Sequence, residues 1–131
     1  MTGLRILLVE DDELNQALVR AILARSANPV LHGAQVVTAG NLAQARAALA
    51  AGAIDIVLLD MRLPDGSGLD LAAELQRHSD QVSPAVIALS GAAAEQREAA
   101  LAAGCVAVLG KPYGPAELAG LLMAHLPVRH E

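Results

Sequence analysis

The sequence is nearly free of aromatic side chains: it has no tryptophan, no phenylalanine and one tyrosine among 131 residues. Proteins that bind single-stranded nucleic acid need aromatic rings on which the bases stack. The formal net charge of -5 also has the wrong sign for neutralising a phosphate backbone. We therefore expect no direct binding of nucleic acid.

Cysteine is almost absent too. Cys105 stands alone, which excludes an intrachain disulfide and a metal site with several cysteine ligands, and we expect it to be a small buried hydrophobic residue. No apolar run approaches the roughly 18 to 20 residues that a membrane span needs, and the first residues show no long apolar segment or cleavage site. The expected setting is a reducing cytoplasm, without a membrane.

Aliphatic residues are abundant, because hydrophobic residues make up 54% of the chain and must fill the core almost without rings. A chain of this length folds as one domain. No linker, repeat or low-complexity tract divides it. We expect a single domain over residues 1–131, with a core of about residues 4–125 and a short frayed tail from Pro127 to Glu131.

Short apolar runs alternate along the chain with segments of helical spacing. Five runs are expected strands, at residues 4–9, 35–39, 54–59, 85–89 and 105–109. Five helices are expected: after the acids of residues 10–13, after an Asn41 N-cap, around residues 69–75, over residues 95–103, and from Pro115 onward. Strict alternation of strand and helix predicts an α/β fold, in which helices cover both faces of a parallel sheet.

Polar residues follow four of the expected strands. Glu10 and Asp11 follow the first strand, Asp60 the third and Ser90 the fourth, and Lys111 lies just beyond the fifth. The carboxyl ends of parallel strands meet at one edge of the sheet, where ligands bind in such folds. Three carboxylates in one cleft repel one another unless a cation lies among them, and hard oxygen ligands suit Mg²⁺. The sequence therefore predicts a magnesium site at this edge.

The same residues predict phosphoryl transfer. Asp60 would be the nucleophile that becomes an aspartyl phosphate, Lys111 would contact one phosphoryl oxygen, and Ser90 would donate a hydrogen bond to another. Each residue also has a simpler interpretation: Asp60 as a turn or N-cap residue, Glu10 and Asp11 as charges at a helix N-terminus, Ser90 as a loop hydroxyl, and Lys111 as a solvated charge. Their coincidence at one edge favours a joint site.

The chain resembles the receiver domain of two-component response regulators through an ordered set of motifs. These motifs are Ile6 to Asp12, Leu58 to Gly66, Ala88 to Gly91, Ala103 to Gly104, and Leu109 to Pro112. The resemblance implies a single flavodoxin-like, doubly wound domain, with five parallel strands in the order 2-1-3-4-5. It also implies that Glu10 and Asp11 form the acidic pocket of such a domain.

The resemblance further implies a role for each site residue. Mg²⁺ would be held by the two pocket acids, by the phosphoacceptor Asp60 and by the backbone carbonyl of Arg62. Ser90 and Lys111 match the switch hydroxyl and the invariant lysine of the family, and the bond from Lys111 to Pro112 would be cis.

A receiver domain of this kind is a signalling module rather than an enzyme, although it promotes its own phosphorylation and dephosphorylation. The phosphoryl donor would be a histidine kinase or a histidine phosphotransfer domain. The chain would be either a stand-alone receiver or one cut from a hybrid sensor kinase.

One departure from the family pattern concerns the output. In the family an aromatic side chain on the fifth strand follows the switch hydroxyl inward, but the matching residue here is Val108. We expect any output to use displacement of backbone and helix near strands four and five, or not to use this face. Receivers often dimerise through the face of the fourth helix, fifth strand and fifth helix, and the alanine and leucine content of this face allows a homodimer.

Two other classes of protein fit part of the pattern. Phosphatases of the haloacid dehalogenase type also use an aspartyl nucleophile in an α/β fold, but they need a second Asp two places later, where this chain has Arg62. A pseudo-receiver that acts only as an interaction scaffold would lack phosphorylation. The intact Asp11, Asp60 and Lys111 oppose this alternative, whereas Val108 and any loss of Mg²⁺ binding would favour it.

Overall fold

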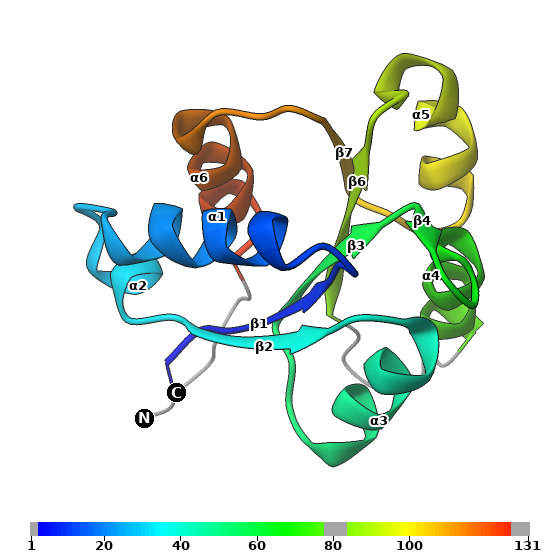
Figure 1. The fold of residues 1–131 in the computed structure, drawn as a ribbon, viewed down its shortest axis with the longest axis horizontal. Coiled ribbons are helices and arrows are strands. Elements are labelled where there is room, and N and C mark those ends of the chain that lie inside the picture. The colour runs from blue at the N-terminus through cyan, green and yellow to red at the C-terminus, as the bar shows by residue number, and fades with distance from the viewer. Residues whose placement is uncertain (1–2, 78–83, 127–131) are drawn as a thin grey trace.

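A parallel sheet forms the centre of the computed structural model, which describes residues 3–77 and 84–126 (Figure 1). Its strands are β1 (Arg5–Val9), β2 (Gln35–Ala39), β3 (Ile56–Asp60), β6 (Ala85–Ser90) and β7 (Ala107–Gly110). The helices are α1 (Glu13–Ala24), α2 (Pro29–His32), α3 (Leu42–Ala51), α4 (Gly68–Arg77), α5 (Ala93–Ala102) and α6 (Pro115–Ala124). A two-stranded ribbon, β4 (Arg62–Leu63) with β5 (Gly66–Ser67), follows β3.

The sheet has the order β2-β1-β3-β6-β7, and all its pairs are parallel. Numbered along the chain, its five strands therefore lie in the predicted order 2-1-3-4-5. The predicted α/β class and doubly wound topology are confirmed. After β1 the chain adds β2 on one side of it, and β3, β6 and β7 follow on the other side. The point between β1 and β3 where the order reverses leaves a crevice at the carboxyl ends of the strands.

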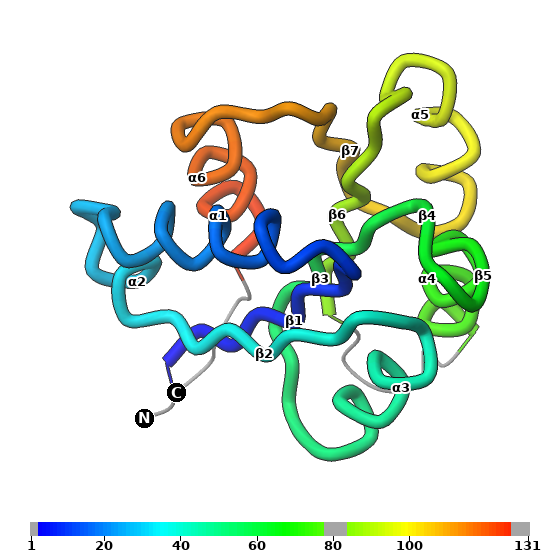
Figure 2. Tube along the Cα trace, in the orientation of Figure 1, coloured from blue at the N-terminus to red at the C-terminus, as the bar shows by residue number. Residues whose placement is uncertain are grey.

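Alternate side chains of the strands build two separate cores. In β1, Ile6 and Leu8 belong to one cluster and Leu7 and Val9 to the other, as the two-residue period of a strand requires. The first cluster also contains residues of α1, α2 and α6, and the second contains residues of α3, α4 and α5. Both faces of the sheet are thus covered (Figures 1 and 2), which explains why the strands read as continuous apolar runs.

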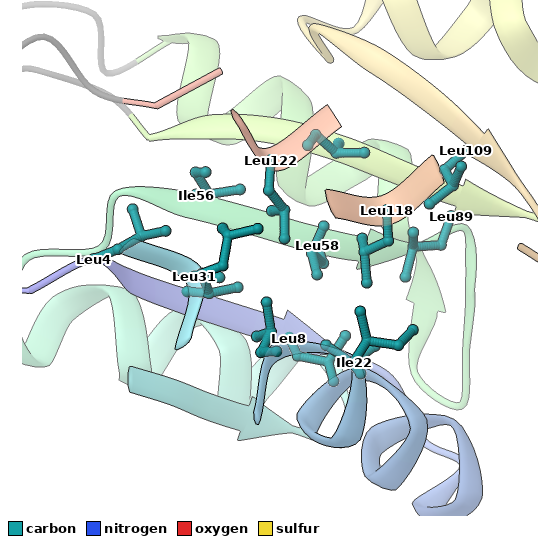
Figure 3. Close-up of a cluster of buried hydrophobic side chains, with 14 of the residues drawn as sticks. Leu4, Leu8, Ile22, Leu31, Ile56, Leu58, Leu89, Leu109, Leu118 and Leu122 are labelled. Carbon is teal, nitrogen blue, oxygen red and sulfur yellow. The ribbon is translucent and has the colours of Figure 1, made fainter. Parts of the chain in front are cut away.

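Aliphatic packing replaces aromatic rings in the core, as the composition predicts. Leu8, Leu58 and Leu89 project from neighbouring strands toward Ile22 of α1 and Leu118 of α6 (Figure 3). All but Ile22 are at most 1% exposed. Burying one such side chain contributes about 1.5–3 kcal/mol to folding, so the many small contributions suffice without rings.

Local capping explains where the main helices begin. The side chain of Asp12 accepts a hydrogen bond from the N–H of Leu14 at the start of α1. The predicted N-cap Asn41 is confirmed, because its side-chain oxygen accepts from the N–H of Gln44 at 2.8 Å. Pro115 is the first residue of α6, also as predicted.

Two small elements were not predicted from the sequence, the helix α2 and the ribbon β4–β5. With α2, residues 3–77 and 84–126 contain six helices rather than the five expected. Helix α2 is a single turn, with Asn28 as N-cap and Pro29 in its first turn; this Asn-Pro pair is the local signal for it. The ribbon β4–β5 pairs Arg62 with Ser67 and Leu63 with Gly66, directly after β3. Both elements are too short for hydrophobic periodicity to reveal them.

Cys105 is buried and free, as expected, and burial raises the pKa of its thiol to about 11. Across residues 3–77 and 84–126, every helix is too short or too polar to cross a membrane. The predicted frayed tail from Pro127 to Glu131 lies outside the described residues.

Gly68, the first residue of α4, brings that helix against the end of β3. Its N–H donates to the carbonyl of Met61 at 3.1 Å. A Cβ at this position would collide with the backbone carbonyl of Asp60 and lie 3.1 Å from Cγ of Leu59. Because a backbone atom of the sheet cannot move aside, only glycine permits this approach.

We expect Gly68→Ala to lower the free energy of unfolding by about 1–3 kcal/mol through overpacking. The matched control is Gly120→Ala in α6, where an added Cβ meets no atom within 4 Å; this change should stabilise the protein by up to about 1 kcal/mol. Urea unfolding followed by circular dichroism measures both. Equal effects of the two substitutions would contradict the proposed contact.

Candidate functional site

The loops that follow β1, β3, β6 and β7 surround an open cavity of about 590 Å³. It is lined by all the predicted site residues: Glu10, Asp11, Asp60, Arg62, Ser90 and Lys111. Backbone hydrogen bonds extend the sheet beyond its strands, because the N–H of Glu10 donates to the carbonyl of Ala39 (2.9 Å) and that of Lys111 to the carbonyl of Ser90 (2.7 Å). The sheet thus gives the site a rigid base.

Three carboxylates meet in this cavity. Glu10, Asp11 and Asp60 each have one carboxylate oxygen within 4.8 Å of an oxygen of the other two. Glu10 and Asp60 are buried, at 1% and 8% exposure, whereas Asp11 is exposed. Mg²⁺ prefers oxygen ligands and keeps several of its waters when it binds. Three carboxylates in a cavity that is open to water therefore fit Mg²⁺.

The ammonium of Lys111 lies between the two buried carboxylates. Its Nζ is 3.0 Å from Oε2 of Glu10 and 3.1 Å from Oδ2 of Asp60. Lys111 is therefore an ion-pair partner, and its interpretation as a solvated charge is wrong. The bond from Lys111 to Pro112 is cis, as the resemblance implied.

Burial and hydrogen bonds change the pKa of Glu10 and that of Lys111 in this cluster. Burial raises the pKa of the Glu10 carboxyl above its ordinary 4.5, and the hydrogen bond with Asp60 adds to this, although Asn15 and Lys111 act in the opposite direction. Burial lowers the pKa of Lys111, but its hydrogen bonds to Glu10 and Asp60 outweigh burial and leave that pKa raised. The lysine stays charged, while the charge of Glu10 is disfavoured unless a cation arrives.

Two residues of α1 hold Glu10 in place, and the sequence patterns predict no role for either. Nδ2 of Asn15 donates to Oε1 of Glu10 at 2.8 Å, and Nε2 of Gln16 donates to the backbone carbonyl of Glu10 at 2.7 Å. They follow Glu10 by five and six residues and lie near the start of α1. These two hydrogen bonds orient the carboxylate of Glu10, which lines the cavity.

Ser90 is buried, at 2% exposure, and its hydroxyl makes two hydrogen bonds. Its Oγ accepts from the N–H of Ala92 at 2.9 Å and donates to Oε1 of Gln96 in α5. Gln96 lines the cavity, but no sequence pattern points to it, because it lies a helical turn into the following helix. Its place depends on how α5 packs.

Asp60 also has the turn role that was its simpler interpretation. Its Oδ1 accepts from the N–H of Arg62 at 3.2 Å, which is the local bond of an Asx turn, while its Oδ2 contacts Lys111. The side chain of Arg62 is exposed. Metal binding by the Arg62 carbonyl stays a prediction.

Val108, which was considered for output, and Tyr113, the single aromatic residue, lie on opposite sides of the sheet. Val108 of β7 is half-buried and packs against the cluster shared by α3, α4 and α5. Tyr113 is half-buried against the other cluster, and burial raises the pKa of its hydroxyl.

A doubly wound α/β domain with carboxylates, a hydroxyl and a lysine at the carboxyl edge of its sheet belongs to a class that binds charged ligands at that edge. The family model of the response regulator receiver domain matches residues 6–122. The chain belongs to this family, and the resemblance read from its motifs is confirmed.

Relatives come from both sensors and regulators. The chain is 34% identical over 123 residues to the aerobic respiration control sensor protein ArcB of Escherichia coli (strain K12), a match that covers 93% of the chain and 15% of ArcB. It is 32% identical over 127 residues to the phosphate regulon transcriptional regulatory protein PhoB of Pseudomonas aeruginosa, covering 96% of the chain and 53% of PhoB. The chain thus spans a small part of this sensor and about half of this regulator.

Solved structures agree with the fold. The receiver domain of the sensor histidine kinase PA1611 from Pseudomonas aeruginosa PAO1, with a magnesium ion in its active site cleft, is 31% identical with a TM-score of 0.80; the match covers 95% of this chain and 98% of that one. The chemotaxis protein CheY4 of Vibrio cholerae has a TM-score of 0.82 at 21% identity, covering 95% of this chain and 100% of that one. This second likeness concerns the fold alone.

We expect Mg²⁺ to raise the melting temperature and Glu10→Gln to reduce this increment. At one hundred times its Kd a ligand adds about 2.7 kcal/mol to stability. Because the pKa of Glu10 is raised above 4.5, the increment should be full above that raised pKa and decline as pH falls through it, when a proton occupies the carboxyl.

The metal-free protein should show the opposite sign. A raised pKa in the folded state means that protonation of Glu10 favours folding, so its contribution to stability grows as pH falls through the raised pKa toward 4.5. Melting curves with Mg²⁺ or with chelator measure both effects. Glu98→Gln, which removes an exposed carboxylate of α5 outside the cavity, is the control; a Glu10→Gln protein that responds to Mg²⁺ like this control would contradict the assignment.

Proposed function

We propose that this receiver domain takes a phosphoryl group from phosphohistidine onto Asp60 and passes the signal on by a conformational change. The observation that carries the proposal is the position of Asp60. This residue is 8% exposed and lines an open cavity, and Nζ of Lys111 lies 3.1 Å from its Oδ2. A carboxylate so placed is accessible for in-line attack and has a cation beside it.

The chemistry uses the residues as follows. A carboxylate oxygen of Asp60 forms a bond to phosphorus while the bond from phosphorus to the histidine nitrogen breaks, and the imidazole keeps that electron pair and takes up a proton. Lys111 offsets the charge of the phosphoryl oxygens, and the Ser90 hydroxyl donates to one of them. Hydrolysis of the acyl phosphate by water later restores the carboxylate.

Magnesium is the cofactor of the proposal. Glu10, Asp11, Asp60 and the backbone carbonyl of Arg62 would hold it, and it would neutralise charge on the phosphoryl oxygens. Support comes from the spacing of the three carboxylates and from the magnesium ion in the PA1611 receiver domain. Asn15 orients Glu10 for this task.

The proposed donor is a histidine kinase or a histidine phosphotransfer domain. Beside the cavity, α1 exposes Leu14 to 81% and Leu18 to 43%, and an apolar hollow of about 340 Å³ separates α1 from α6. Apolar side chains exposed next to a reactive pocket suit a helical partner that must bring its histidine over Asp60.

The setting of the domain is also part of the proposal. Relatives include a sensor protein and a transcriptional regulator, so the chain fits either a stand-alone receiver or one cut from a hybrid kinase. A free, buried Cys105 is compatible with a reducing cytoplasm.

A homodimer through the face of α5, β7 and α6 is a further proposal. Leu101 at the end of α5 and Val106 before β7 are 40% and 43% exposed, which gives this face apolar surface to bury. The strand order and family membership speak against the phosphatase alternative, and the paired Lys111 speaks against a scaffold without phosphorylation.

The test is incubation with Mg²⁺ and acetyl phosphate followed by intact-mass measurement. The wild type should gain one phosphoryl group, and Asp60→Ala should gain none because the nucleophile is gone. Asp70→Ala, which removes an exposed aspartate of α4 outside the cavity, should be labelled like the wild type. Full labelling of Asp60→Ala would refute the assignment, and an unlabelled wild type that also fails to bind Mg²⁺ would favour the scaffold.

A further inference from the structure

The hydroxyl of Ser90 is already engaged in the unphosphorylated protein. It accepts from the N–H of Ala92 at 2.9 Å and donates to Oε1 of Gln96. A serine hydroxyl has one O–H to donate. While Gln96 accepts that hydrogen, Ser90 has none left for a phosphoryl oxygen on Asp60.

Gln96 connects the cavity to α5. It is half-buried and lines the cavity together with Ser90 and Ala92. Its helix has a weak start, because the N-cap Ala92 provides no side-chain hydrogen bond and Ala100 is the helix's one buried residue. The two bonds to Ser90 therefore hold the first turn of α5 at the cavity.

An aromatic side chain cannot carry the signal from Ser90 in this chain. The matching position on β7 is Val108, and the single aromatic residue, Tyr113, packs on the other side of the sheet. The hydrogen bond to Gln96 is a side-chain contact that links the hydroxyl to a helix instead.

We propose that Gln96 is a positioning residue: it holds the Ser90 hydroxyl on α5 until a phosphoryl group on Asp60 takes up the hydroxyl hydrogen. This inference rests on the proposed function. Phosphorylation replaces a neutral hydrogen bond by a charge-assisted one, which is the stronger. The exchange releases the side chain of Gln96, so the first turn of α5 moves without an aromatic relay.

The test compares binding of beryllofluoride, a mimic of the phosphoryl group, to the Mg²⁺-loaded protein by amide NMR titration. Gln96→Met keeps length and helix propensity but removes the acceptor. Because Ser90 then no longer has to break a bond, Gln96→Met should bind roughly two- to tenfold more tightly than the wild type. Gln76→Met, the same change at an exposed site on α4 outside the cavity, should bind like the wild type.

A thermodynamic cycle separates positioning from general effects on folding. In a Ser90→Ala background the gain from Gln96→Met should vanish, because no hydroxyl is left to release. In the wild type, beryllofluoride should shift the side-chain amide pair of Gln96 and the N–H of Ala92. Gln96→Ala serves as a second variant should the methionine substitution fail to fold.

The outcomes distinguish the two levels of the argument. A wild type whose Asp60 and Arg62 amides do not respond to beryllofluoride overturns the proposed function, and the role of Gln96 with it. A wild type that binds, beside Gln96 variants with unchanged or weaker binding, overturns the role of Gln96 alone. A gain that persists in the Ser90→Ala background does the same.

Discussion

The ion pairs of Lys111 are the interaction on which the site depends. Parallel strands bring Glu10, Asp11 and Asp60 to one edge of the sheet, and two of these carboxylates are buried. Without a cation their repulsion and desolvation would oppose folding. The ammonium lies within 3.1 Å of both buried carboxylates, yet the pKa of Glu10 is still raised. One lysine therefore stabilises the metal-free site only in part, and the three carboxylates at the open cavity fit a divalent cation beside it.

The architecture serves this arrangement by keeping the edge rigid. Two cores, one on each face, clamp the sheet, while hydrogen bonds such as that from Glu10 to Ala39 extend it into the site. The helix contacts are less uniform. Helix α1 supports the acidic pocket through Asn15, whereas α5 begins without a cap and contacts Ser90 through Gln96. The acidic pocket is therefore held by side-chain hydrogen bonds from its helix, whereas the first turn of α5 lacks a side-chain cap and is held at the cavity through Ser90.

Much of this was predictable from periodicity and strand ends. The five strands follow from apolar runs and alternation, and the site residues Glu10, Asp11, Asp60, Ser90 and Lys111 follow from the strand ends. The order of the strands came from the resemblance to the receiver family. The one-turn helix α2 and the ribbon β4–β5 were not predicted, because segments of two to four residues are too short to show a hydrophobic period. The role of Gln96 was not predicted for another reason: its contact with Ser90 depends on how α5 packs against the sheet.

The sequence by itself determined the class of fold, the edge of the sheet where the polar residues gather and the residue types found there, because strand patterning and parallel topology are local or combinatorial rules. Only the tertiary structure decided which charges are buried, that Lys111 lies between Glu10 and Asp60, and that the Ser90 hydroxyl is bonded to α5. These depend on distances and desolvation across elements remote in the chain, and no local pattern encodes them.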